Sequence, residues 1–315
     1  MMLRFDQRLF RNIITVSFLF LFITGTALAQ MGNGAGTTSG EILNIGIGSR
    51  ATSLGGAFTA FSDDATAPFW NPSGLSGAGS TEIQFGHSTW YQDISLNYLG
   101  AVIPVSDRLS TGIGVAYVDF GEFMGYNEAD ESTGAFTGHN VVLSLSMAYM
   151  LSERLSLGVT AKGITEKLDD SQAQGFAFDI GTRYNTGIFS IGLAAKNIGS
   201  GLKYEYESSP FPTKYCAGLG ISTYSGKLRF ASDIDMPRNG NLSLHQGVEY
   251  LYMNTIFLRS GYVHSFNDTV DNSSVNGLVY GFGLQINAGS IDYSYVPNGD
   301  FGGIHRIDFS WKLGH

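Results

Sequence analysis

The chain has 315 residues, a formal net charge of −9, 14% charged residues, 13% aromatic residues and 42 glycines. Soluble domains average about 25% charged residues, so this share is low. An acidic balance without a basic tract excludes a nucleic-acid-binding protein. The mean hydropathy is +0.04, and after residue 29 no run reaches the roughly 18 apolar residues of a membrane helix. We therefore expect apolar residues to alternate with small and polar ones.

Residues 1–29 have the pattern of a cleavable secretory signal. Three arginines in the first eleven residues precede an apolar stretch at 13–23, and Ala27-Leu28-Ala29 has the small-x-small form of a cleavage site. An N-terminal membrane anchor is the alternative. The sequence predicts that the chain is exported and that the mature protein begins at Gln30.

Residues 30–80 do not alternate, and we interpret them as an N-terminal extension followed by a hatch on the periplasmic side of a barrel. Residues 30–45 are rich in Gly, Ser and Thr, which favours a flexible lead-in. Residues 46–75 combine glycines, a double acid and an aromatic-Asn-Pro run. The candidate hatch or gate residues are Arg50, Gly55, Gly56, Asp63, Asp64, Trp70, Asn71 and Pro72.

Each of these residue types suits a plug, although simple turn chemistry is the alternative for each. Gly55 and Gly56 permit a positive φ and a close approach of the backbone to the barrel wall. Pro72 fixes its own φ and favours an extended residue before it. Asp63 and Asp64 can cap the short segment 65–69 or meet basic side chains in the lumen. Arg50 is expected to pair with a lumenal carboxylate.

From Thr81 onward, apolar residues recur at every second position, which predicts β-strands. Each candidate strand has about the length that crosses a bilayer at a tilt. The fourteen candidates are 81–90, 94–105, 109–120, 139–150, 155–167, 174–184, 188–197, 213–224, 227–235, 243–252, 255–266, 275–287, 289–297 and 304–313.

The connections between these strands alternate in length. Two- to three-residue polar turns alternate with longer connections at 121–138, 168–173, 198–212, 236–242, 267–274 and 298–303. Outer-membrane barrels combine short periplasmic turns with longer outer loops. Residues 81–315 are therefore predicted to form an all-β, 14-stranded antiparallel transmembrane barrel in the outer membrane of a Gram-negative-type bacterium. A soluble sandwich or a propeller is the alternative.

The second face of the strands carries Gly, Ser, Thr and Ala with scattered charges, which predicts a mostly small and polar lumen. The charged side chains on it can select a polar solute, or they can form internal ion pairs, which we favour. By alternation, the lumen-facing charged residues are Lys162, Glu166, Lys196, Arg229, Asp233, Asp235, Arg259, Asp292, Arg306, Asp308 and Lys312.

Motifs of enzymes and of cofactor sites are missing from the sequence. The run Gly46-x-Gly48-x-x-Ala51 lacks the strand-turn-helix context of a dinucleotide site. The six histidines are dispersed and have no metal-ligand spacing. No nucleophile lies close in sequence to His139 or His305. We therefore expect no catalytic activity, no cofactor and no metal.

Residues 49–75 resemble the PorV/PorQ family of outer-membrane proteins, a branch of the FadL-like barrels. The resemblance lies in three runs: Arg50-Ala51-x-x-Leu54-Gly55-Gly56-Ala57-Phe58, then Asp63-Asp64-Ala65-Thr66-Ala67, then Trp70-Asn71-Pro72-Ser73-Gly74-Leu75. Ser73 replaces the usual Ala, and Pro68 precedes Phe69. The resemblance implies a fourteen-strand barrel with an N-terminal hatch, in which Asn71-Pro72-Ser73 matches the Asn-Pro-Ala motif of FadL-like hatches.

Two functions follow from the resemblance. The PorV/PorQ branch implies a membrane component of type IX protein secretion, with secretion-system components or exported cargo proteins as partners. The FadL-like relation implies a gated transporter of hydrophobic or amphipathic small molecules. Both place the barrel in the lipid bilayer of the outer membrane. A general porin is a weaker alternative because a plug fills the lumen.

Overall fold

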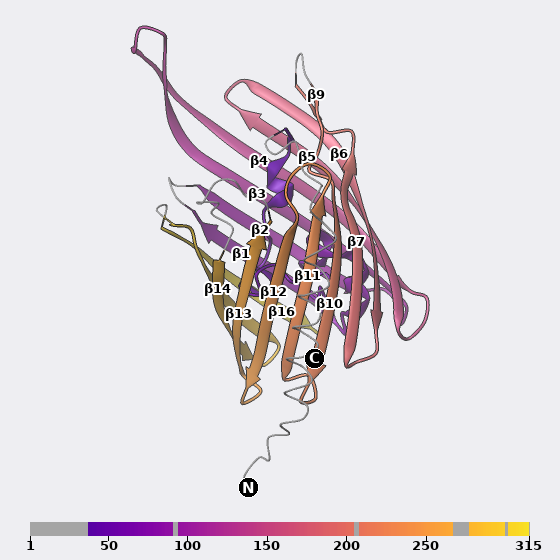
Figure 1. The fold of residues 1–315 in the computed structure, drawn as a ribbon. Coiled ribbons are helices and arrows are strands. Elements are labelled where there is room, and N and C mark those ends of the chain that lie inside the picture. Colours follow the sequence, from indigo (N-terminus) through magenta and orange to yellow (C-terminus); the bar gives the residue numbers. More distant parts are fainter. Residues whose placement is uncertain (1–36, 91–93, 205–207, 267–276, 300–301, 315) are drawn as a thin grey trace.

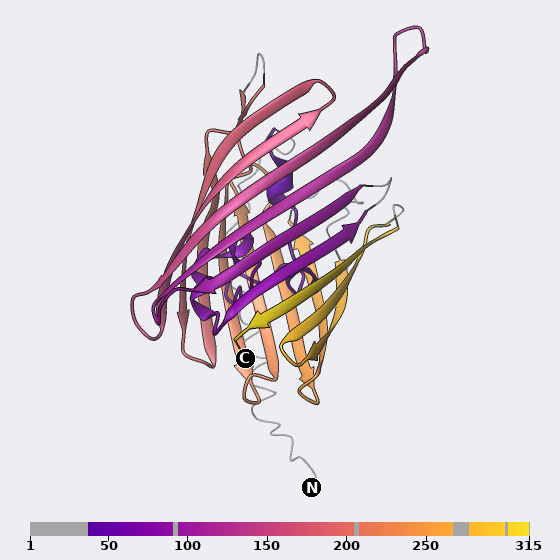
Figure 2. The same ribbon diagram turned by 180° about the vertical axis from the view of Figure 1, so that it is seen from behind.

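The computed structural model describes residues 37–90, 94–204, 208–266, 277–299 and 302–314. Residues 1–29, with the expected signal and its cleavage site, lie outside the described residues. Fourteen long strands form one closed antiparallel barrel (Figures 1 and 2). The strands are β1 (Thr81–Thr89), β2 (Ser95–Pro104), β3 (Leu109–Tyr126), β4 (Ser132–Met150), β5 (Leu155–Leu168), β6 (Ser171–Asn185), β7 (Phe189–Gly199), β10 (Lys214–Thr223), β11 (Leu228–Pro237), β12 (Ser243–Tyr252), β13 (Ile256–Ser265), β14 (Gly277–Ile286), β15 (Gly289–Pro297) and β16 (Gly303–Leu313).

Closure of the barrel is made by the first and last strands. β1 pairs with β16 from Thr81↔Leu313 to Thr89↔His305. Two short strands, β8 (Leu202–Lys203) and β9 (Ser208–Ser209), lie in the connection between β7 and β10. One end of the barrel, the short-turn end, has only short turns, whereas the other, the long-loop end, has the longer connections and the two-residue turn between β5 and β6. β1 therefore starts, and β16 ends, at the short-turn end.

The outer face of the barrel is apolar, as the alternation predicts. In β6, Phe176, Phe178 and Ile180 are 71%, 59% and 53% exposed, while Ala177 and Asp179 between them are buried. A closed barrel satisfies its backbone groups between strands, so an apolar outer face can lie against lipid. No helix among the described residues is long and apolar enough to cross a membrane.

Two of the expected long loops are strand instead. β3 continues to Tyr126 and β4 begins at Ser132, so most of 121–138 is a two-stranded ribbon that rises beyond the other strands (Figures 1 and 2). A bulge at Gly121, with φ 74°, starts this ribbon. β5 and β6 likewise pair up to Leu168↔Ser171. Both faces of these extensions are largely exposed, so their sequences lack the alternation by which a strand is recognised.

Residues 37–80, here called the lumenal segment, lie inside the barrel. They contain four short helices, η1 (Glu41–Asn44), α2 (Ser49–Ser53), α3 (Ala67–Trp70) and η2 (Pro72–Gly77). α2 packs against β13 to β16 and η2 against β3 to β6. The segment thus touches opposite walls of the barrel.

The first part of the lumenal segment lies at the long-loop end of the barrel, and the expected placement of residues 30–80 on the periplasmic side stays a prediction. Ser39 donates its N–H to Pro210 O at 2.9 Å and its hydroxyl to Ser209 O at 2.7 Å. Ile42 and Leu43 are buried in one cluster with Leu202 and Phe211. This apolar contact holds residues that a Gly- and Ser-rich composition alone marks as flexible.

Candidate functional site

Inward-facing glycines on the strands let the lumenal segment lie directly on the barrel wall. A Cβ on Gly158 of β5 would stand 2.3 Å from Pro72 C, and one on Gly181 of β6 would stand 2.0 Å from Asn71 Oδ1. Gly192 of β7 and Gly261 of β13 would meet backbone atoms of the segment at 2.3 and 2.1 Å. Real Cβ atoms do not come this close to other atoms, so these strand positions require glycine.

Asn71 and Pro72 lie at the centre of one of these contacts. The Asn71 side chain is fully buried; its Nδ2 donates to Thr59 O at 2.9 Å, and its Oδ1 accepts from Ser73 Oγ at 2.7 Å and caps η2 through Ser73 N. Its backbone is extended, with φ −149° and ψ 108°, as expected for a residue before proline. The Asn-Pro pair therefore starts η2 and anchors it.

The paired glycines form a bend in the segment. Gly55 and Gly56 have φ values of 69° and 80°, where residues with a Cβ are strained. Gly55 also lies against the backbone of Tyr262 in β13, and its carbonyl is 2.6 Å from Nδ1 of His245 in β12. The bend is thus fixed to two neighbouring strands.

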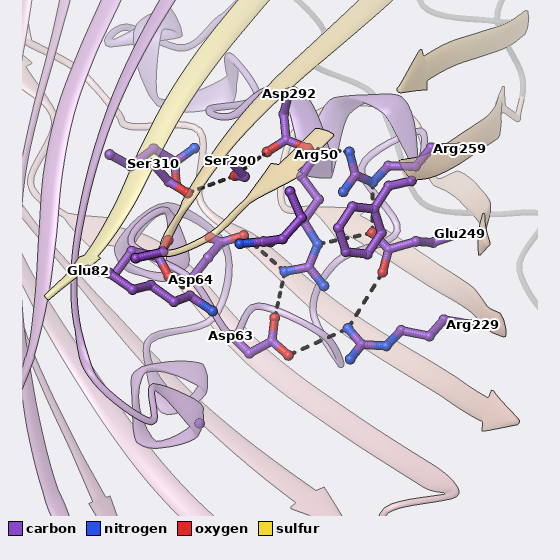
Figure 3. A pocket seen from close by; sticks show the side chains of 16 residues that line it. Arg50, Asp63, Asp64, Glu82, Arg229, Glu249, Arg259, Ser290, Asp292 and Ser310 are labelled. Carbon is purple, nitrogen blue, oxygen red and sulfur yellow. Dashed lines mark hydrogen bonds and ion pairs between the residues drawn. The ribbon is translucent and has the colours of Figure 1, made fainter. Parts of the chain in front are cut away.

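Arg50 connects the segment to the charged wall of the lumen (Figure 3). Its Nη1 lies 2.7 Å from Asp63 Oδ1 and 3.2 Å from Asp64 Oδ2, and its Nε lies 3.2 Å from Glu249 Oε2. The guanidinium also lies 5.1 Å from the centroid of the Phe58 ring. Burial raises the pKa of Asp63, but Arg50 and two further arginines outweigh it and hold that pKa well below its usual range.

Glu249 continues this ion network into the barrel wall. Its Oε2 is 2.7 Å from Arg259 Nε in β13, and its Oε1 is 3.6 Å from Arg229 Nη1 in β11. Arg259 Nη1 lies 2.5 Å from Asp292 Oδ1 in β15. Figure 3 shows these groups around a cavity of about 230 Å³, which also contacts Gly77, Ala288 and Lys312 near the short-turn end.

The other lumen-facing charges mostly bind the backbone of the segment or each other. Asp233 accepts from the N–H groups of Phe58 and Thr59 at 2.9 and 2.7 Å. Asp308 accepts from Ser49 N, and Arg306 donates to Gly46 O, each at 2.5 Å. The remaining contacts are Lys162 with Asp179 at 2.6 Å, Lys214 with Asp235 at 3.0 Å, Lys312 with Glu82 at 3.9 Å, Glu166 with Asn140 at 2.9 Å, and Lys196, 5.3 Å from the Trp70 ring centroid.

A second cavity, of about 570 Å³, lies on the other side of the segment, toward the long-loop end. Gly55, Gly56 and Trp70 contribute to its lining, and Trp70 is held by a bond from its Nε1 to Ile47 O at 2.8 Å. Its apolar lining residues come from the segment, and from β1, β2, β3 and β13 to β16 or the residues next to these strands: Ile42, Ile45, Trp70, Trp90, Ile94, Leu96, Val118, Phe120, Val263, Val279, Val296 and Ile304.

The sequence predicts a lumen lined mostly by small and polar residues, and this prediction is wrong for the half of the lumen at the long-loop end. Along β13 the inward positions run from Val263 through Gly261 to Arg259. Along β15 they run from Val296 through Ser294 to Asp292. The lumen changes from apolar to charged between the long-loop end and the short-turn end, and an average over whole strands hides this change.

All eight residues of the expected hatch set lie in the lumenal segment, but they do not form one cluster: Arg50 contacts Asp63 and Asp64, whereas Asn71 and Pro72 pack on β5 and β6. The structure adds two residues that the sequence analysis did not single out. Glu249 contacts Arg50, and His245 contacts Gly55. Both occupy the same face of β12 as Gly247, which packs on Leu54. The register pairs Glu249 with Arg259, and opposite charges on neighbouring strands were the sequence signal that could have identified Glu249.

No group of three or more His, Cys, Asp or Glu side chains in the described ranges could hold a metal ion. The site thus consists of the lumenal segment, a charged cavity at its short-turn side and an apolar cavity at its long-loop side. Such an arrangement can bind an apolar molecule above a barrier fixed by ion pairs and hydrogen bonds.

Comparison with solved structures shows the same fold. The toluene transporter TodX of Pseudomonas putida aligns with a TM-score of 0.63 and 14% identity, over 84% of this chain and 96% of that one. A FadL homologue of Pseudomonas aeruginosa aligns with a TM-score of 0.57 and 12% identity, over 84% of this chain and 98% of that one. The fold is thus that of FadL-type channels.

Comparison of sequences identifies the family. No curated protein matches the chain. A model of the Uncharacterised protein family (UPF0164) matches residues 23–211, which include the lumenal segment and more than half of the chain. The protein therefore belongs to the Uncharacterised protein family (UPF0164).

Proposed function

We propose that the protein is an outer-membrane channel for hydrophobic or amphipathic small molecules, with the lumenal segment as its hatch. The observation that carries this proposal is the apolar cavity of about 570 Å³ next to Gly55, Gly56 and Trp70. Pockets for small ligands measure about 300–1,000 Å³ and are mostly apolar. The apolar outer face and the fold shared with a toluene transporter support the same proposal.

The two sides of the segment have different roles in this function. A molecule that enters from the long-loop end, the outer side by its loop lengths, reaches the apolar cavity first. Beyond it lie Arg50, Glu249 and Arg259, whose ion pairs oppose the passage of an apolar solute. Passage therefore requires the segment to move, which makes Arg50, Gly55, Gly56, Asp63, Asp64, Trp70, Asn71 and Pro72 parts of a gate.

A bulky side chain inside the cavity tests the binding step. Val263 is 6% exposed and lines the cavity, so Val263→Trp fills part of the space. We expect the affinity for butylbenzene to fall about tenfold or more, which corresponds to about 1.4 kcal/mol. The measurement is equilibrium binding of tritiated butylbenzene to the barrel in lipid nanodiscs, corrected for partition into empty nanodiscs.

Val159→Trp is the matched control, because Val159 is 52% exposed on the outer face. This variant should bind butylbenzene as the wild type does. Two results would count against a ligand site in the cavity: a wild type that does not bind butylbenzene specifically, or an equal loss of binding in Val263→Trp and Val159→Trp.

A role in protein secretion is a second candidate, favoured by the ribbon of β3 and β4. Its residues Met124 and Tyr126 are 56% and 61% exposed, and Phe123 stacks on Phe136 with ring centroids 5.6 Å apart. The ribbon rises beyond the rest of the barrel (Figure 1), where it can meet a secretion component or a cargo protein. This function needs no passage of a solute, so measured hydrocarbon uptake separates the two candidates.

A further inference from the structure

Three buried polar atoms on one wall of the apolar cavity have no hydrogen-bond partner within the described part of the chain. They are Nε of Arg306, Oδ1 of Asn298 and Nε1 of Trp90. Arg306 and Asn298 are 6% and 5% exposed, and all three residues line the cavity. A buried polar group without a partner costs about 1–3 kcal/mol, so three on one wall call for an explanation.

The three groups lie on adjacent strands at the long-loop end. Trp90 follows β1, Arg306 is in β16, and Asn298 follows β15. The Arg306 guanidinium carbon is 5.8 Å from the centroid of the Trp90 ring. Arg306 is oriented by the bond from its Nη1 to Gly46 O, which leaves its Nε–H for another acceptor. Two N–H donors thus lie close together at the edge of an apolar space.

Other polar groups around the cavity do have partners in the protein. Trp70 Nε1 donates to Ile47 O, and Lys214 pairs with Asp235. Asn140 donates to Glu166 at 2.9 Å, and His245 contacts Gly55 O. The unpartnered atoms are therefore concentrated on the wall formed by β1, β15 and β16.

We propose that this wall binds the polar end of the transported molecule, which is an apolar body that carries one hydrogen-bond-accepting oxygen. An indole N–H and a guanidinium N–H only donate, so Trp90 and Arg306 select an acceptor: a ketone, an ester or a carboxylate. The unpartnered atom of Asn298 is the acceptor Oδ1, so it does not bond this oxygen, and the selection rests on the two N–H donors. The apolar body occupies the side lined by Val263 and Val279.

This inference rests on the proposed ligand-binding function, and a set of three ligands of matched size tests the two separately. Butylbenzene has no acceptor, butyrophenone has a carbonyl, and 4-phenylbutyrate has a carboxylate. We expect at least one of the two oxygen-bearing ligands to bind the wild type about tenfold more tightly than butylbenzene, a difference of about 1.4 kcal/mol. Affinities are measured with the full barrel in lipid nanodiscs.

Trp90→Phe removes the donor and keeps an aromatic ring. We expect it to reduce the preference for oxygen-bearing ligands over butylbenzene, taken as the ratio of affinities within the variant, about threefold or more. Trp70→Phe is the control, because its N–H is already bound to Ile47 O; this variant changes the three affinities in parallel. Arg306→Gln is a second test and should also reduce this preference. It is used only if the variant unfolds at the same temperature as the wild type.

Equal affinities for the three ligands in the wild type would overturn the polar wall and leave the hydrocarbon cavity in place. An undiminished preference in both Trp90→Phe and Arg306→Gln would overturn the assignment of these donors. If the wild type binds none of the three ligands specifically, the proposed function and this inference are overturned together.

Discussion

Replacing Glu249 with glutamine lowers the free energy of unfolding of the barrel by about 3 kcal/mol, near the lower limit for breaking a buried ion pair. Glutamine keeps the shape of the side chain and removes its charge. Arg259 and Arg50 then lose the carboxylate at 2.7 and 3.2 Å, while the Arg259 side chain stays 2% exposed. The measurement is urea-induced unfolding in lipid vesicles, followed by intrinsic fluorescence.

The control for this prediction is a weaker ion pair of the same cavity. Lys312 has a side chain that is 44% exposed and lies 3.9 Å from Glu82 Oε2. Such partly solvated pairs contribute about 0–1 kcal/mol, so Lys312→Gln should lower the free energy of unfolding by no more than about 1 kcal/mol. Equal losses in the two variants would show that the network around Arg50 and Glu249 does not hold the segment.

Substitution of Gly158 with valine displaces the lumenal segment from β5 and raises the ion conductance of single barrels above that of the wild type. A Cβ at this position would lie 2.3 Å from both Pro72 C and Ser73 N, and a backbone cannot yield as a flexible side chain does. Overpacking of this kind costs about 1–3 kcal/mol. Conductance in planar lipid bilayers measures the opening directly, and urea unfolding measures the loss of stability.

Gly163→Val in the same strand is the matched control. A Cβ there has only Phe176 Cε1 nearby, at 3.8 Å, which is an ordinary contact on the outer face. The control therefore keeps the conductance of the wild type. If Gly158→Val conducts no better than Gly163→Val, residues 70–77 do not close the lumen.

The barrel could be predicted from the sequence because two independent patterns agree. Lipid requires an apolar side chain at every second position, and short turns alternate with longer connections. Where strands leave the lipid, as in Glu122 to Tyr126, neither face is buried and the alternation ends. The pattern therefore underestimates the length of β3 and β4.

The lumenal site was predicted only in part, because its contacts join residues far apart in the chain. The Arg-Ala, Asp-Asp and Asn-Pro runs identify the segment, and Gly55 and Gly56 do take positive φ values. By contrast, Asp233 binds the backbone of Phe58 and Thr59 from 174 or more residues away. The apolar cavity depends on where Val263 and Val296 lie along their strands, which alternation alone does not reveal.

The central claim is that an apolar molecule passes through the barrel by way of the cavity. The most direct test is the initial rate of butylbenzene entry into vesicles with an outer leaflet of lipopolysaccharide, which slows passive entry. We predict a faster rate with the wild-type barrel than in vesicles without protein, and a return to the protein-free rate with Val263→Trp. A wild-type rate equal to that of protein-free vesicles would contradict the claim and favour the role in secretion.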